Sequence, residues 1–163
     1  MVRTANISDD GVYRYSLGRI WQPAKPKVCF VMLNPSTADA HIDDATLRRC
    51  IGYAATWKYG GLYVLNLFAL RSRDPNRLKH HPDPVGPDNK LVFKTILGAS
   101  AKVVCAWGDH GKLHNQWKRA YLWIWASDHK PTALRINKSG MPAHPLYLPQ
   151  DLVPAFYKPP FSL

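Results

Sequence analysis

Three largely apolar runs, at residues 28–33, 62–70 and 102–107, dominate the hydrophobic pattern of the chain. Runs of this length are typical of strands that are buried on both faces, as in a parallel sheet covered by helices. Residues that favour turns or loops follow the runs and mark where each expected strand ends. The pattern therefore predicts a core of parallel strands.

Helices are expected between these strands, because apolar residues recur there at spacings of three and four. The first predicted helix follows Asp43 and Asp44 and is closed by Gly60 and the glycine after it. Two further helices are predicted over residues 88–98 and from about 113 to 125. The apolar face of the first helix comprises Leu47, Cys50, Ile51, Ala54 and Ala55.

Shorter elements flank this core. Residues 1–27 alternate loosely and predict an antiparallel ribbon around Gly18, appended to the sheet. Residues 132–136 predict a short fourth strand, and residues 140–149 predict an extended loop. With 163 residues the chain suits one domain and is too short for two. We therefore predict one α/β domain over residues 1–163, with three α/β/α layers and a mostly parallel central sheet of about four strands.

Candidate site residues stand at the ends of the expected strands. Asn34 and Pro35 end the first apolar run, and Asn66 lies within the second. Trp107 ends the third run and is the aromatic candidate for stacking on a base. Ligands of open α/β sheets bind beyond the carboxyl ends of the strands, so these residues predict a binding crevice. The alternatives are a simple turn at Asn34 and an Asn66 amide that is satisfied inside the core.

The charge of the chain points to an anionic partner. There are 22 Lys and Arg against 11 acids, all of them Asp, which gives a formal net charge of +11. This balance predicts a nucleic-acid partner, and a basic enzyme without such a partner is the alternative. The connection over residues 71–86 is basic, proline-rich and long, which is typical of a binding loop. The candidates for phosphate binding are Ser36, Arg71, Arg73, Asn76 and Arg77.

The sequence contains no pattern that is typical of a metal site or of a membrane protein. Cys29, Cys50 and Cys105 lie far apart without a CxxC pair, so we expect reduced core residues and no metal or cofactor. The N-terminus lacks an apolar signal region, and no apolar run approaches the roughly 20 residues that span a membrane. We expect a cytoplasmic monomer without a membrane partner.

Short motifs give the chain a resemblance to two families. Taken in order, residues 32–35, 63–67, 103–108 and 143–146 resemble motifs of the uracil-DNA glycosylase superfamily. This resemblance covers roughly residues 28–150, and it departs from the superfamily at Met32, where a glycine is usual. A closer resemblance, to domain-of-unknown-function family 1643 (DUF1643) of bacteria and phages, extends along nearly the full chain. The residues that carry it are 33–39, 43–44, 66–71 and 144–148.

The glycosylase resemblance implies a similar fold, DNA as the nucleic-acid partner, and a site that hydrolyses the N-glycosidic bond of a flipped base. It implies that Asn34 holds the attacking water, that His144 donates to the departing base, and that Asn66 reads the base edge. Asp39 and Asp44 are further catalytic candidates for activating water, with helix capping as the alternative role. The residues predicted to contact the base are Leu33, Pro35, Asn66 and Trp107.

Two other functions remain open at this point. One is a non-catalytic nucleic-acid-binding module on the same scaffold. The other is an enzyme that acts on free nucleotides or another small substrate, because a fold does not determine a function.

Overall fold

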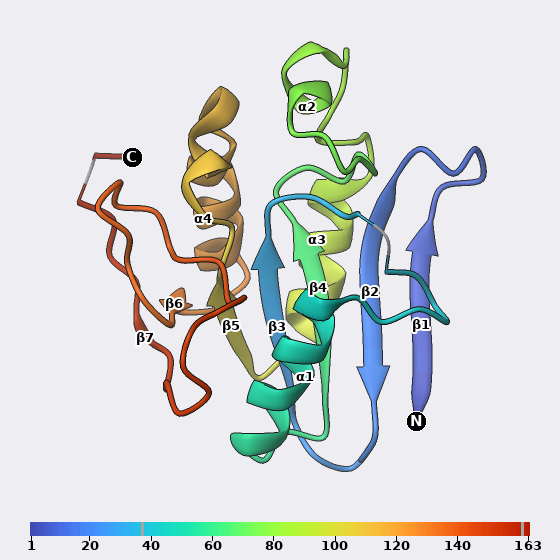
Figure 1. Ribbon diagram of the computed structural model, residues 1–163, viewed down its shortest axis with the longest axis vertical. Coiled ribbons are helices and arrows are strands. Elements are labelled where there is room, and N and C mark those ends of the chain that lie inside the picture. The colour runs from blue at the N-terminus through green and yellow to red at the C-terminus, as the bar shows by residue number, and fades with distance from the viewer. Residues whose placement is uncertain (37, 161) are drawn as a thin grey trace.

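A seven-stranded sheet forms the centre of the computed structural model, which describes residues 1–36, 38–160 and 162–163 (Figure 1). The strands lie in the order β1-β2-β4-β3-β5-β6-β7. Their bounds are Val2–Ile7 (β1), Arg14–Ile20 (β2), Lys27–Met32 (β3), Gly61–Asn66 (β4), Lys102–Cys105 (β5), Thr132–Ala133 (β6) and Ala155–Phe156 (β7). The helices are Ala45–Thr56 (α1), Asn76–His80 (α2), Asn89–Gly98 (α3) and Gln116–Ala126 (α4), with a 3-10 segment at Asp109–Asn115 (η1).

The central strands β4, β3, β5 and β6 pair in parallel. The predicted α/β class with a parallel centre is therefore confirmed. β1 and β2 form the predicted antiparallel ribbon, but β2 also pairs directly with β4 and so belongs to the sheet. The ribbon turns between β1 and β2 and not at Gly18, which lies inside β2. A side chain at Gly18 would collide with the hydroxyl of Thr4, so this glycine permits close strand contact.

Alternate residues of the central strands face two separate hydrophobic clusters. In β3, Phe30 lies in the cluster that includes α1, whereas Val31 lies in the cluster that includes α3 and α4. β4 repeats this alternation with Val64 and Leu65. Because each strand is buried on both faces, its sequence is continuously apolar. The helices therefore cover both sides of the sheet in three layers (Figure 1).

A side-chain cap sets the start of α1, whereas the other described helices start without one. Asp44 is the N-cap of α1, and its Oδ1 accepts a hydrogen bond from the Leu47 N–H at 2.8 Å. α3 matches its predicted range, although the Asp88 side chain makes no capping hydrogen bond there. α4 begins later than the predicted residue 113, because Leu113 and His114 have non-helical backbone angles. The apolar spacing predicted the helix, and the preceding kink decided where it starts.

The three cysteines are free thiols in the buried core, as predicted. Within the described ranges, no helix combines the length and apolar character that a membrane span requires. The fourth predicted strand is shorter than expected, and the chain after β6 continues as a loop toward residue 144.

Candidate functional site

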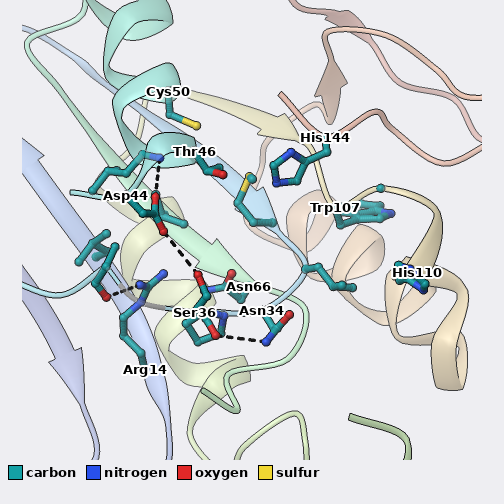
Figure 2. Close-up of a pocket in the computed structure, with 18 of the residues that line it drawn as sticks. Arg14, Asn34, Ser36, Asp44, Thr46, Cys50, Asn66, Trp107, His110 and His144 are labelled. Atoms are coloured by element: carbon teal, nitrogen blue, oxygen red, sulfur yellow. Dashed lines mark hydrogen bonds between the residues drawn. The ribbon is translucent and has the colours of Figure 1, made fainter. Parts of the chain in front are cut away.

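A pocket of about 520 Å³ lies at the carboxyl ends of the parallel strands, next to the first turn of α1 (Figure 2). This is the place where open α/β sheets bind ligands. The volume falls within the roughly 300–1,000 Å³ that is typical of small-molecule sites. The polar residues of the lining are Arg14, Asn34, Ser36, Asp44, Thr46, Asn66, Asp109, His110, Asn137 and His144.

The pocket brings together most of the residues that the sequence singled out. Those that line it are Leu33, Asn34, Pro35, Ser36, Asp44, Asn66, Trp107 and His144. The residues that lie outside the lining are Asp39, Arg71, Arg73, Asn76 and Arg77. Thr37, which belongs to the motif over residues 33–39, lies outside the described residues. Segments far apart in the chain therefore converge on one cavity, while the basic connection does not enter it.

Asn66 is the most unusual polar group of the lining. The residue is 1% exposed, and neither its Nδ2 nor its Oδ1 has a hydrogen-bond partner in the described part of the chain. Its position in β4 has the same parity as Leu62 and Val64, which places the side chain on the α1 face. A buried amide without partners costs about 1–3 kcal/mol for each polar atom that is left unpaired. Within the described residues, no neighbouring group of the core satisfies the Asn66 amide, in contrast to the alternative expectation.

Asn34 lies in the same pocket, but its amide group is engaged. Its Nδ2 donates to the backbone oxygens of Ser72 at 2.8 Å, Pro35 at 3.1 Å and Leu70 at 3.4 Å. These bonds connect the loop after β3 to the loop after β4. Asn34 therefore stabilises the wall of the pocket, and it offers a ligand or a water mainly its amide oxygen.

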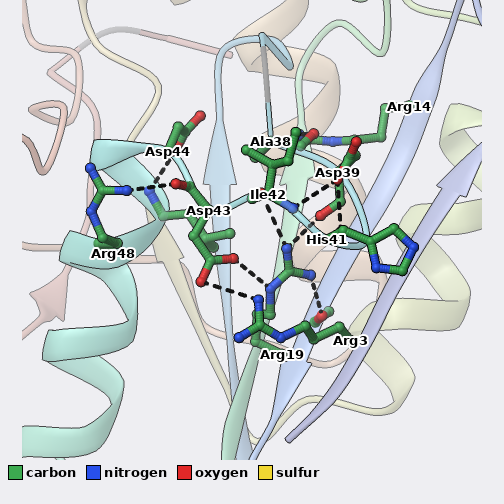
Figure 3. A network of polar contacts seen from close by, with 12 residues as sticks. Arg3, Arg14, Arg19, Ala38, Asp39, His41, Ile42, Asp43, Asp44 and Arg48 are labelled. Carbon is green, nitrogen blue, oxygen red and sulfur yellow. Dashed lines mark hydrogen bonds and ion pairs between the residues drawn. The ribbon is translucent and has the colours of Figure 1, made fainter.

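The two candidate aspartates have different surroundings. Asp44 lines the pocket while capping α1, and the hydroxyl of Ser36 lies 3.5 Å from its Oδ2. Asp39 instead turns away into the loop after β3, where its Oδ1 accepts from the N–H groups of His41 at 2.7 Å and Ile42 at 2.8 Å (Figure 3). These two hydrogen bonds lower the pKa of Asp39. Of the two candidate aspartates, only Asp44 therefore lines the pocket, and Asp39 belongs to the loop.

His144 reaches the pocket from the loop after β6 (Figure 2). The backbone N–H of Leu146 donates to its Nδ1 at 3.2 Å, so the neutral ring carries its proton on Nε2. The residue as a whole is exposed at the pocket mouth. The surrounding loop nevertheless desolvates the ring and lowers its pKa, against the opposing charge of Asp44. A neutral imidazole with an Nε2–H donor is therefore the prevailing form near pH 7.

Trp107 belongs mainly to the core. It is 1% exposed, and its Nε1 donates to the sulfur of Met141 at 3.4 Å. Its ring packs edge-on against Tyr157 at a centroid distance of 6.0 Å. Trp107 lines the pocket with a small part of its surface, so the predicted stacking of a base on this ring has little exposed area to use.

Arg14 is one of the pocket residues that the sequence pattern did not reveal. It is 4% exposed; one terminal nitrogen donates to the backbone oxygen of Ala38 at 2.7 Å, and its Nε has no partner among the residues that the structure describes. Burial lowers the pKa of Arg14 to about 10, which leaves the guanidinium charged near pH 7. Nothing in the loose alternation of β2 distinguishes this arginine from a surface residue.

Two arginines of β2 hold the loop over residues 38–44 (Figure 3). Arg19 is fully buried, its Nε lies 2.9 Å from Oδ1 of Asp43, and it also donates to the backbone oxygen of Asp39. Arg3 of β1 adds a longer contact of 3.6 Å to the same carboxylate. The bonds from Arg14 and Arg19 connect this wall of the pocket to the sheet.

The basic connection lies near the pocket but outside it. It follows β4, and the Asn34 bond to Ser72 links its start to the pocket wall. Arg73 and Arg77 are exposed, and neither forms an ion pair within the described residues. No group of three or more His, Cys or Asp side chains in the part of the chain described lies close enough to hold a metal ion.

Comparison with known proteins identifies the family. The family model described as "Protein of unknown function (DUF1643)" matches residues 14–146, and the chain therefore belongs to this family. The match includes Arg14, the strand-end asparagines and His144. No curated protein and no solved structure matches the chain.

Proposed function

We propose that this member of the family binds a nucleobase in the pocket and pairs the edge of that base with Asn66. The observation that carries the proposal is the Asn66 amide, which is 1% exposed, lines the pocket and has neither polar atom bonded. A side-chain amide offers one acceptor and two donors in one plane. Nucleobases present neighbouring donors and acceptors in the same arrangement, so both halves of the amide can be paired at once.

The size and the polarity of the site support this class of ligand. The cavity of about 520 Å³ has room for a planar base and attached groups. Both polar atoms of the Asn66 amide are unpaired within the described residues, and the edge of a base can pair both of them. An apolar ligand would instead leave the amide unpaired, which is unfavourable by about 1–3 kcal/mol for each atom.

The proposal extends to a base within a nucleic acid. It is supported by the net charge of +11 and by the exposed Arg73 and Arg77 on the connection that begins beside the pocket wall. Replacing Arg71, Arg73 and Arg77 together by Ala should flatten the salt dependence of binding by about one unit for each lost phosphate contact. The matched control is the double replacement of Lys90 and Lys94 on α3, which packs on the opposite face of the sheet. An unchanged slope in the triple variant would assign DNA binding to another surface.

We further propose that the protein hydrolyses the N-glycosidic bond of the bound base. Negative charge develops on a departing base, and the Nε2–H of a neutral His144 is a suitable donor to it. The Asp44 carboxylate in the same pocket can orient or deprotonate the attacking water, and the amide oxygen of Asn34 can accept a hydrogen bond from that water. The resemblance of the strand-end motifs to the uracil-DNA glycosylase superfamily supports the same reaction and a similar fold.

The experiment that tests the proposal uses oligonucleotides that contain uracil and other modified bases, in single-stranded and duplex form. Mass analysis then detects the free base and the abasic strand. Release of a base supports hydrolysis. Binding without release across the panel would identify a non-catalytic binding module. Turnover of nucleotides alone, without binding of oligonucleotides, would identify an enzyme for free nucleotides.

A further inference from the structure

Two arginines of β2 differ in how their charge is compensated. The Arg19 guanidinium is paired with the carboxylate of Asp43 at 2.9 Å. Arg14 is almost as deeply buried, but within the described residues it forms no ion pair. The only hydrogen bond that its side chain makes within those residues is to a neutral backbone oxygen, that of Ala38 at 2.7 Å. The positive charge of Arg14 therefore has no direct counter-ion in the described protein.

A β-bulge directs Arg14 into the pocket. The pairing of β1 with β2 shifts by one residue, so that Asn6 opposes Ser16 while Ile7 opposes Arg14. Tyr15 is skipped, and its hydroxyl lies on the other side of the sheet, 3.4 Å from the N–H of Asp88. A bulge of this kind re-aims a side chain. Arg14 thereby shares the α1 face with Leu17, and both line the pocket.

The unused hydrogen-bonding capacity of Arg14 is suited to an oxyanion. Its Nε is buried and unbonded, and the residue lines the same cavity as the unpaired Asn66 amide. An isolated buried charge is costly unless it is paired. A guanidinium binds planar or tetrahedral oxyanions through several N–H groups at once. Because these two unpaired buried groups line the same cavity, we expect one ligand that carries both a base and an anion.

We propose that Arg14 binds a phosphate group attached to the nucleoside whose base pairs with Asn66. This inference rests on the proposed function, because it takes the base site as given. The ligand is then a nucleotide unit, and neither a free base nor an unphosphorylated nucleoside satisfies the whole pocket. The phosphate is a monoester in a free nucleotide or a diester in a nucleic acid.

The charges around Arg14 favour a phosphate of low charge. Asp44 and Asp39 act on Arg14 with negative charge, and Arg71 and Arg19 act on it with positive charge. Asp44 also lines the pocket and repels an anion that approaches it. A singly charged diester or monoester anion suits this balance better than a triphosphate.

The experiment measures binding of three probes: inorganic phosphate, a panel of nucleosides, and the same nucleosides as 5′-monophosphates. The panel is then repeated with dinucleotides joined by one phosphodiester. The variants are Arg14→Met, which keeps an unbranched side chain of similar length, and Arg119→Met, which removes an exposed arginine from α4 on the opposite face. In the wild-type protein, the Arg14 Nε–H resonance is followed by NMR during titration with inorganic phosphate.

We expect the phosphorylated probes to bind the wild-type protein about 10-fold or more tightly than the nucleosides, because hydrogen bonds to charged groups are strong. Arg14→Met should remove this preference and leave nucleoside binding unchanged, whereas Arg119→Met should keep it. Preference for the dinucleotide assigns the phosphate to a nucleic acid, and preference for the monophosphate assigns it to a free nucleotide.

Two results would overturn the inference. One is an Arg14 Nε–H resonance that does not respond to phosphate, and this reading does not depend on how well the variant folds. The other is equal binding of nucleosides and monophosphates by the wild-type protein. Asn66→Leu is included to separate the two sites: if phosphate shifts the Arg14 resonance but Asn66→Leu binds every probe as the wild-type protein does, the base site fails and the anion site stands.

Discussion

Two buried asparagines lie close together on opposite faces of the sheet, and their amides are used differently. Asn89, at the start of α3, donates through Nδ2 to the backbone oxygens of Asn66 at 3.0 Å and Leu67 at 3.3 Å. Asn66, at the end of β4, directs its own amide into the pocket, where both polar atoms are unbonded. The two residues are equally inaccessible, at 0% and 1% exposed.

The Asn89 amide therefore has a structural role, whereas the Asn66 amide is available to a ligand. The Asn89 bonds satisfy carbonyl groups at the end of β4, where the regular ladder stops, and so they stabilise the fold. The Asn66 amide contributes no hydrogen bond to the fold in the described residues and carries a desolvation cost. Burial alone therefore does not reveal which polar residue is functional. The hydrogen-bond partners do.

The largest effect on activity is expected for His144, the proposed donor to the departing base. If bases are released, His144→Ala should lower the rate by about 10²–10³, because a donor to charge that develops in the transition state is lost. Binding should change little, and His144→Gln should restore part of the rate. Single-turnover kinetics measures both effects. An unchanged rate in both variants would make His144 structural and leave Asp44 as the catalytic candidate.

Asn66→Leu tests directly whether the amide that lines the pocket serves a ligand and not the fold. The replacement removes the amide oxygen and the amide nitrogen that pair with the edge of the base. The affinity for the base should therefore fall by roughly 10²-fold. The fold should keep its stability or gain about 1 kcal/mol, because two unpaired polar atoms are replaced by an apolar group of similar shape. Calorimetric titration and denaturant unfolding provide the two measurements. Loss of stability together with loss of binding would mean that Asn66 supports the fold.

Asn89→Leu is the matched replacement on the other face. It leaves the carbonyl groups of Asn66 and Leu67 without a donor, and the free energy of unfolding should fall by about 1–3 kcal/mol. Ligand binding by the folded fraction should remain near the wild-type value. Urea unfolding monitored by tryptophan fluorescence measures the change. If Asn89→Leu is stable but does not bind the ligand, Asn89 would be the binding residue and Asn66 the structural one.

The smallest effect concerns Asp39, which is satisfied within its loop. Backbone hydrogen bonds hold its folded-state pKa below the ordinary value, so the ionised group stabilises the folded protein above the unfolded pKa near 3.9. This contribution is lost as the pH falls through the lowered folded-state pKa. Asp39→Asn should therefore reduce stability slightly at neutral pH and weaken the acid dependence of the melting temperature.

The control for this measurement is Asp151→Asn, which replaces an exposed aspartate outside the loop. Catalysis and binding should be unchanged in Asp39→Asn if the residue serves only the loop. A large loss of turnover in this variant would return Asp39 to the catalytic candidates.

The sequence by itself determined the order and type of the main elements. The apolar runs became β3, β4 and β5, because strands covered on both faces need apolar residues at every position. Asp44 capped α1 because a side-chain oxygen before a helix bonds to the first free N–H groups, and this is a local interaction. The gathering of Asn34, Asn66 and His144 at one edge followed from the order of parallel strands.

Only the tertiary structure decided which of these polar groups are free. Asn34 and Asn66 look equivalent in the sequence, yet the loop after β4 supplies carbonyl partners to Asn34 and none to Asn66. Arg14 enters the pocket through a bulge that depends on the register between β1 and β2. Asp39 is withdrawn by the path of its loop. Local patterns place a residue on an element, but its partners come from distant segments, and so its role is determined only when the chain has packed.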